Sequence, residues 1–144
     1  MRVGFDRYWV ADFRMTLTTL PGTTPPTTFD VVLERQAGDR TPTEDGNDVV
    51  VLVSLSVAVR WPNSEPGPFE LSVATVGEFR FPATMPDADS QRLCAYHAPA
   101  LLYSQIRPLV RMHAAEAGVP GFMLPLLNVA ASLQQAERES TPGR

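Results

Sequence analysis

The chain has 144 residues, of which 44% are hydrophobic and 19% charged, a balance typical of a single globular domain rather than a disordered segment. A formal net charge of −4 argues against nucleic acid as the main partner. The single cysteine, Cys94, excludes an intrachain disulfide and permits a reducing compartment. We therefore expect a cytoplasmic protein with no direct membrane insertion, because no apolar stretch is long enough to span a bilayer.

The N-terminal part of the chain predicts two strands joined by a long crossover. Residues 3–17 alternate between apolar and polar side chains, with Trp9 on the apolar side and Arg7 as an interruption. A shorter strand is predicted over 29–35. The Thr- and Pro-rich segment at 18–28 suits a crossover rather than a tight turn.

The middle of the chain predicts a hairpin of two long strands. Apolar residues recur at every second position over 48–61 and again over 69–81. The turn residues of 62–68 predict that these two strands are antiparallel neighbours. Residues 37–47 are polar and predict a mobile loop. At ~3.4 Å per residue the last strand would run roughly 40 Å, and two helices cannot cover such a sheet, so we expect packing between subunits.

Helices are predicted only after residue 86. A short helix is expected over 87–95, then a longer one over 98–117 that bends at Pro108, and a last helix over 128–138. Gly118 and the following proline end the longer helix. Its apolar stripe, which we expect at a subunit interface, consists of Leu102, Ile106, Leu109 and Val110.

The loop at 119–127 is too apolar for an ordinary solvated connection and too rich in proline and glycine for a helix. It is expected either to plug the core or to contact an apolar partner, and the local pattern does not decide between them.

No catalytic or metal-binding pattern is recognisable. His97 and His113 are the only imidazoles, and neither has a cysteine or carboxylate at a metal-binding spacing. Cys94 has His97 three residues further on, but a buried structural thiol is the simpler interpretation. Nucleophile-elbow, phosphate-loop and dinucleotide motifs are absent from the sequence. We therefore expect no enzyme activity, no metal and no cofactor.

The order of these parts matches a known family, and the match covers about residues 3–137. Its most specific part is the Tyr–Pro–Leu–Leu–Tyr helix entry, followed by Gly-x-Pro and an asparagine that begins the last helix. The matching residues are Arg7, Tyr8, Trp9, Asp12, 48–59, Phe69, Gly77, Phe79, Ala95, Tyr96, 99–103, Arg107, Gly118, Pro120, Leu124 and Asn128. On these residues the chain resembles the SecB family of protein-export chaperones.

The resemblance implies an α+β fold: a four-stranded antiparallel sheet with a long crossover between its first two strands, then a long helix and a C-terminal helix. It implies one domain over 1–138 with a frayed tail at 139–144. It also implies a homo-oligomer, a tetramer in preference to a dimer, that binds unfolded preproteins without ATP. The client-binding groove is expected to be lined by Val31, Leu33, Phe69, Leu71, Phe122, Met123, Leu124, Leu126, Leu127, Val129 and Leu133.

The acidic positions through which the family docks onto the SecA motor are only partly present. Asp12 matches one of them, and Glu70 stands beside another that is Ser72 here. Thr16 replaces a further acidic residue, and an acidic C-terminal tail is missing. These departures suit equally well a chaperone that protects the antitoxin of a toxin–antitoxin pair. An alternative of another class is a small-molecule binding protein or hot-dog-like enzyme, for which His97 is the candidate polar group.

Overall fold

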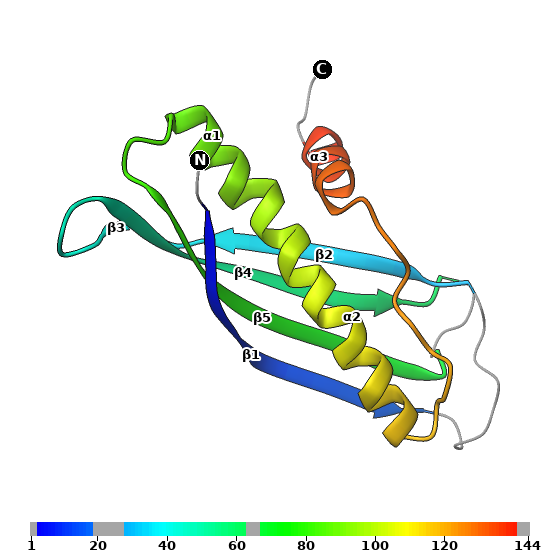
Figure 1. Cartoon of the computed structure of the whole chain (residues 1–144). Helices are drawn as coiled ribbons and strands as arrows, with labels where there is room; N and C mark the ends of the chain where they lie inside the picture. Colours follow the sequence, from blue (N-terminus) through cyan, green and yellow to red (C-terminus); the bar gives the residue numbers. More distant parts are fainter. Residues whose placement is uncertain (1–2, 19–27, 63–66, 141–144) are drawn as a thin grey trace.

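The computed structural model describes residues 3–18, 28–62 and 67–140. These residues form an α+β fold in which helices cover one face of an antiparallel sheet (Figure 1). The strand order is β1-β5-β4-β2, and the short β3 pairs with the beginning of β4, on the same edge as β2. The predicted crossover at 18–28 and turn at 62–68 lie largely outside the described residues. The strands are β1 (Gly4–Leu17), β2 (Asp30–Ala37), β3 (Thr41–Pro42), β4 (Asp48–Arg60) and β5 (Phe69–Pro82).

The two long central strands confirm the hairpin prediction. β4 and β5 are antiparallel, with Val51 opposite Phe79 and Val57 opposite Val73. Their odd-numbered side chains point toward the helices and are buried, except for the partly buried Val49 and Val59, whereas the even-numbered ones are partly or fully exposed. β-Branched and aromatic residues at every second position therefore build the sheet side of the core.

The outer strand β1 differs from its predicted pattern because two irregularities interrupt its pairing with β5, between Phe5 and Arg7 and between Val10 and Asp12. Each extra residue reverses the face on which the following side chains lie. Arg7 and Trp9 consequently lie on the helix-free face, so the prediction that Trp9 shares a side with Phe5 is wrong. The second irregularity returns the rest of the strand to the expected alternation.

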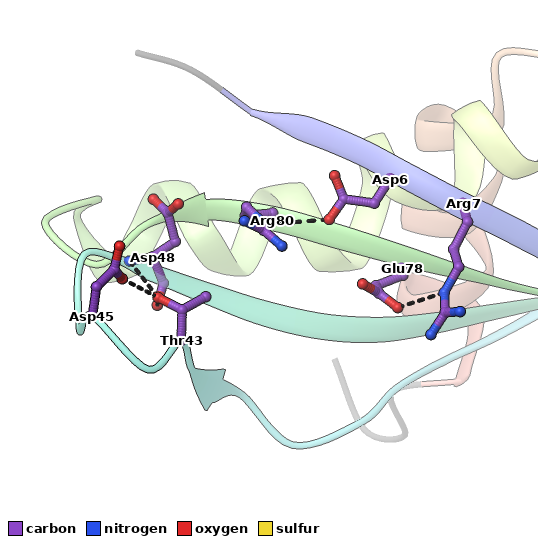
Figure 2. A network of polar contacts seen from close by, with 7 residues as sticks. All are labelled: Asp6, Arg7, Thr43, Asp45, Asp48, Glu78 and Arg80. Atoms are coloured by element: carbon purple, nitrogen blue, oxygen red, sulfur yellow. Dashed lines mark hydrogen bonds and ion pairs between the residues drawn. The ribbon is translucent and has the colours of Figure 1, made fainter.

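Ion pairs join β1 to β5 at the first irregularity. The Nε atom of Arg7 lies 2.8 Å from a carboxylate oxygen of Glu78, and Arg80 lies 3.2 Å from Asp6 (Figure 2). An Arg–Glu pair directly across two strands holds their register. Arg7, which interrupts the alternation in the sequence, is thus the ion-pair partner of Glu78 on the neighbouring strand.

The polar segment predicted as a mobile loop at 37–47 is partly ordered. β3 occupies two of its residues, with Thr41 opposite Val50 on β4. The Thr43 hydroxyl donates to a carboxylate oxygen of Asp45 at 2.6 Å and accepts from the backbone N–H of Asp48 at 3.2 Å (Figure 2). These bonds close the turn into β4.

The two predicted helices before residue 118 form one continuous helix: α1 (Asp87–Arg92), the π-helical turn η1 (Leu93–His97) and α2 (Ala98–Glu116). The N–H of Ala98 bonds to the carbonyl of Leu93, five residues back. Pro99 has no N–H for the helix, and the wider turn before it accommodates the missing bond. Figure 1 shows the continuous helix crossing the sheet. α2 also continues past the expected bend at Pro108.

The apolar stripe of α2 packs on the sheet of its own chain. Leu102, Ile106 and Val110 have no exposed surface, whereas Leu109 is partly exposed. Fully buried side chains cannot contact a second subunit, so Leu102, Ile106 and Val110 belong to the core of the protomer, whereas a subunit contact at Leu109 remains a prediction. The exposed apolar residues of α2 lie on its opposite side and include Leu101 and Met112.

The last helix, α3 (Val129–Ser140), begins as predicted at an asparagine. The Asn128 side-chain oxygen accepts the N–H of Ala131 at 3.1 Å, which is N-cap geometry. Val129 and Leu133 are buried, and the remaining side chains are mostly exposed. α3 extends two residues past the expected end, and 141–144 lie outside the described residues.

Candidate functional site

An apolar hollow of about 400 Å³ lies between β2 and α3, and we call it the β2–α3 hollow. Four of the residues predicted to bind a client line it: Val31 and Leu33 from β2, Leu127 from the loop, and Leu133 from α3. The sequence interpretation missed the other lining residues, which are Phe29, Asp30, Val32, Pro125, Ser132 and Ala136.

The apolar loop before α3 is held in place by side chains of α2. The hydroxyl of Tyr103 donates to the carbonyl of Pro125 at 2.6 Å, and Nε of Arg107 donates to the carbonyl of Leu124 at 3.0 Å. Burial raises the pKa of Tyr103 to about 12, so its hydroxyl keeps the proton that it donates. An irregular apolar loop can therefore lie against the core because α2 satisfies its backbone carbonyls.

Side chains of this loop point in two directions: some plug the core, as one alternative predicted, and others stay exposed, while the predicted contact with an apolar partner remains a prediction. Phe122 and Leu124 are buried in the core. Met123 is exposed, and Leu126 has 84% of its surface exposed. Neither exposed residue lines the β2–α3 hollow, and Leu127 is the loop leucine that does.

The other predicted groove residues belong to the core. Phe69, Leu71 and Val129 are each at most 3% exposed and do not line the hollow. A client could reach them only after the surrounding side chains move. The residues predicted to line one groove therefore fall into different groups: some line the β2–α3 hollow, and others are buried in the core.

An aromatic cluster closes one end of the hollow. The ring of Phe122 lies edge-on to Phe69 with centroids 4.7 Å apart, and Phe29 lies 5.3 Å from Phe122 and 5.4 Å from Trp61. The indole N–H of Trp61 donates to the carbonyl of Phe69 at 2.7 Å. Phe29 belongs both to this cluster and to the lining of the hollow, which extends the apolar surface available to a ligand.

A polar bridge stands at the other end of the hollow. Arg35 of β2 forms an ion pair with Glu137 of α3, and the Tyr96 hydroxyl donates to the same carboxylate at 2.8 Å. The Arg35 guanidinium also lies 5.0 Å from the centre of the Tyr96 ring. The Tyr96 hydrogen bond, and after it Arg35, lower the pKa of Glu137. This bridge connects β2, the π-turn and α3.

β2 also presents backbone groups beside the hollow. Within the described residues it pairs with β4 alone, from Asp30 opposite Arg60 to Ala37 opposite Val53. The N–H and C=O groups on its other edge have no neighbouring strand there. An extended peptide can pair with such an edge while its side chains enter the adjacent hollow.

The described residues hold no cluster of three or more metal-ligating side chains. Burial raises the pKa of the Cys94 thiol, which makes it a poor nucleophile. His97 is exposed, and His113 packs on Phe13 with ring centroids 4.5 Å apart. Over the same residues, no helix is long and apolar enough to cross a membrane. The hot-dog-like alternative therefore gains no support at its candidate group, His97.

The residues predicted to dock onto SecA lie on the helix-free face of the sheet. Asp12 is opposite Ala74 on β5, and its carboxylate lies 3.1 Å from Nε of Arg14. Glu70 and Ser72 lie on the same face of β5. Trp9 contributes exposed apolar surface to this face, so it is not a continuous acidic patch.

No family model matches the sequence, and no curated protein matches it significantly. The fold, however, matches solved structures. A SecB-like chaperone from Mycobacterium tuberculosis, solved with a ChAD peptide from the HigA1 antitoxin, superimposes with a TM-score of 0.64 at 14% identity, covering 88% of this chain and 91% of that one. A protein of unknown function from Streptococcus agalactiae gives a TM-score of 0.51 at 16% identity, over 88% and 98% of the two chains. The fold is therefore SecB-like, as the sequence resemblance predicted.

Proposed function

We propose that this chain is an ATP-independent holdase that binds extended apolar segments of non-native polypeptides in the β2–α3 hollow. The observation that carries the proposal is the position of that hollow beside the edge of β2 that pairs with no other described strand. The SecB-like fold supports it, since a chaperone of that fold holds a peptide.

The physical basis is the burial of apolar surface that an unfolded chain exposes. Each Å² removed from water stabilises a complex by about 25 cal/mol. Backbone pairing with β2 adds affinity that does not depend on the client sequence, and the hollow selects apolar side chains at alternate positions. Because the ligand is the unfolded form of the client, binding delays folding and aggregation by mass action and needs no nucleotide.

The client class that we favour is a segment of a specialised partner, such as an antitoxin, over preproteins delivered to SecA. The similar chaperone was solved with an antitoxin peptide. The helix-free face supports the same choice, because Asp12 is paired with Arg14 and Ser72 carries no charge. Preprotein binding with SecA docking is the alternative, and identification of the chain that co-purifies from the native host distinguishes the two.

Leu127 and its neighbour Leu126 provide a direct test of the hollow. Leu127→Asp places a charge in the lining, whereas Leu126→Asp places the same charge on an exposed side chain outside it. We expect wild type and Leu126→Asp to suppress the light scattering of an aggregating unfolded client at similar ratios, without ATP. Leu127→Asp should need several-fold more protein, because a carboxylate in an apolar contact is costly to desolvate.

Circular-dichroism melts of both variants serve as the control, since a general loss of structure would also reduce suppression. Equal suppression by the two variants would remove the hollow as the client site. No suppression by wild type at several-fold excess over client would remove the holdase function.

We also propose that the chain forms a homo-oligomer, a tetramer in preference to a dimer. Apolar residues remain exposed on the helix-bearing side of the protomer, on β1 and on the outer side of α2. They are Tyr8, Val10, Leu101 and Met112, each at least 40% exposed. A contact between copies through these residues would remove that apolar surface from water.

A further inference from the structure

A second hollow, of about 320 Å³, lies beyond the polar bridge, and we call it the Arg40 hollow. The end of β2 contributes Arg35, Gln36 and Ala37, and the helix contributes Gln91 and Cys94. Its only charged lining residues, within the described part of the chain, are Arg35 and Arg40. This hollow is therefore positively charged, in a protein whose net charge is −4.

Arg40 is available to a ligand in a way that Arg35 is not. Arg35 is occupied by Glu137 and Tyr96. The guanidinium of Arg40 lies 5.9 Å from the ring centre of Phe81, and over the described residues it makes no ion pair or hydrogen bond. Ring contact uses the face of a guanidinium and leaves the N–H groups, which lie in its plane, free to donate to a carboxylate.

The two hollows are arranged in series along β2. Residues 29–33 line the apolar hollow, Arg35 forms the bridge, and residues 35–37 line the charged hollow. A strand advances about 3.3 Å per residue. An extended peptide paired with β2 that fills the apolar hollow near Val31 would reach the Arg40 hollow about four to six residues further along.

Resting on the proposed function, we infer that the preferred client segment is bipartite: an apolar stretch bound in the β2–α3 hollow, with an acidic residue about four to six positions away bound by Arg40. The charge of the second hollow selects the acidic residue, just as the lining of the first selects apolar ones. Arg40 is then a specificity residue, whereas the partly exposed apolar lining of the first hollow, Val31 and Leu33 included, supplies most of the affinity.

The test uses three labelled peptides with the same apolar centre and either Glu, Gln or Lys at both ends, about five residues from the centre. Placing the residue at both ends makes the result independent of strand direction. For wild type we expect the Glu peptide to bind about three- to ten-fold more tightly than the Gln peptide, and the Lys peptide to bind most weakly. In Arg40→Gln the three affinities should converge on that of the Gln peptide.

Arg14→Gln is the matched control, because Arg14 is also exposed but lies on the helix-free face beside Asp12. It should keep the wild-type preference for the Glu peptide. Equal binding of the three peptides to wild type, or a preference that persists in Arg40→Gln, would overturn this inference and leave the holdase proposal standing. Failure of every peptide to bind wild type would contradict the proposed function itself, and the inference with it.

Discussion

Gly77 leaves room for the long helix near the middle of β5. A Cβ atom at this position would lie 2.8 Å from Cδ2 of Leu102 and 2.8 Å from Cε2 of Phe79. Both neighbours are fully buried, so neither can move aside without disturbing the core. A single missing side chain on the sheet thus lets α2 pack directly over β5.

Gly77→Val should consequently destabilise the protein by about 1–3 kcal/mol, because overpacking forces buried side chains out of their preferred rotamers. Gly38→Ala is the control, since a Cβ there would be 3.4 Å from its nearest neighbour, the carbonyl oxygen of Leu52, an ordinary contact. Denaturant unfolding of both variants measures the difference. A free energy of unfolding for Gly77→Val equal to that of wild type would show that the helix does not need this space.

Single residues also explain which details of β1 could be predicted. Its existence follows from its alternation, but the face on which Trp9 lies does not. The two β-bulges leave no mark in apolar periodicity except the misplaced Arg7, whose partner Glu78 lies on a strand more than 60 residues away. The sequence signal for the first bulge was Arg7, a charged residue inside an apolar alternation. It could be interpreted only once Glu78 on the neighbouring strand was known to be its partner.

At the scale of elements, the position of α3 depends on few contacts. Its buried side chains within the described residues are Val129 and Leu133, near its start. Near its end, Glu137 is joined to Arg35 and Tyr96. The bridge therefore anchors the half of α3 that has little apolar contact, and it fixes the wall of the β2–α3 hollow.

Glu137→Gln should loosen the end of α3, because the amide cannot pair with the Arg35 charge. Hydrogen exchange at constant pH should show faster exchange in α3 and unchanged exchange in α2. Glu139→Gln is the control, since within the described part of the chain Glu139 bonds only to Gln135 of the same helix. Equally slow exchange in wild type and Glu137→Gln would show that the bridge does not hold the helix.

The effect of the bridge also depends on pH. Its contacts lower the pKa of Glu137 from the ordinary value of 4.5. A lowered folded-state pKa means that the stabilisation is complete above that ordinary value and is lost as pH falls through the lowered pKa. The difference in melting temperature between wild type and Glu137→Gln should therefore be constant near neutral pH and vanish in acid.

The helices show why elements were easier to predict than their connections. Pro99 correctly marks a change in the helix, but the sequence interpretation placed a break where the structure has a π-turn. A proline at a first helical turn and a proline behind a π-turn give the same local sequence. Packing of Leu93 and Cys94 in the core keeps the two segments in line, and that packing is set by the distant sheet.

At the scale of the whole molecule, the sequence predicted several residues that line the candidate site, but not which predicted residues line it and which are buried in the core. Apolar residues of β2, the loop and α3 were expected together, and Val31, Leu33, Leu127 and Leu133 do surround one hollow. Tyr103 and Arg107 of α2 hydrogen-bond to the loop and so determine which loop residues are buried in the core. This is a contact between segments that are distant in sequence. The Arg40 hollow was missed for the same reason, since its residues come from a loop, a strand and a helix.

The proposed homo-oligomer would form through apolar surface that the protomer leaves exposed. The stripe Leu102, Ile106 and Val110 is used inside the protomer, so the contact between copies should use the other side of α2. Met112, at 52% exposed, lies on that side, and Leu52, at 43%, lies on the helix-free face of the sheet. The two residues are matched in exposure and differ in location, which makes them a suitable pair for a test.

We expect wild type to sediment well above the 15.8 kDa of one chain at micromolar concentration. Met112→Asp should shift the protein toward smaller species, because a carboxylate buried at a subunit contact must lose its hydration. Leu52→Asp should sediment as wild type does, since its face stays in water. A wild-type monomer would refute the assembly, whereas a shift caused by Leu52→Asp alone would move the contact to the helix-free face. In either case the β2–α3 hollow would remain open to a client, because neither residue lines it.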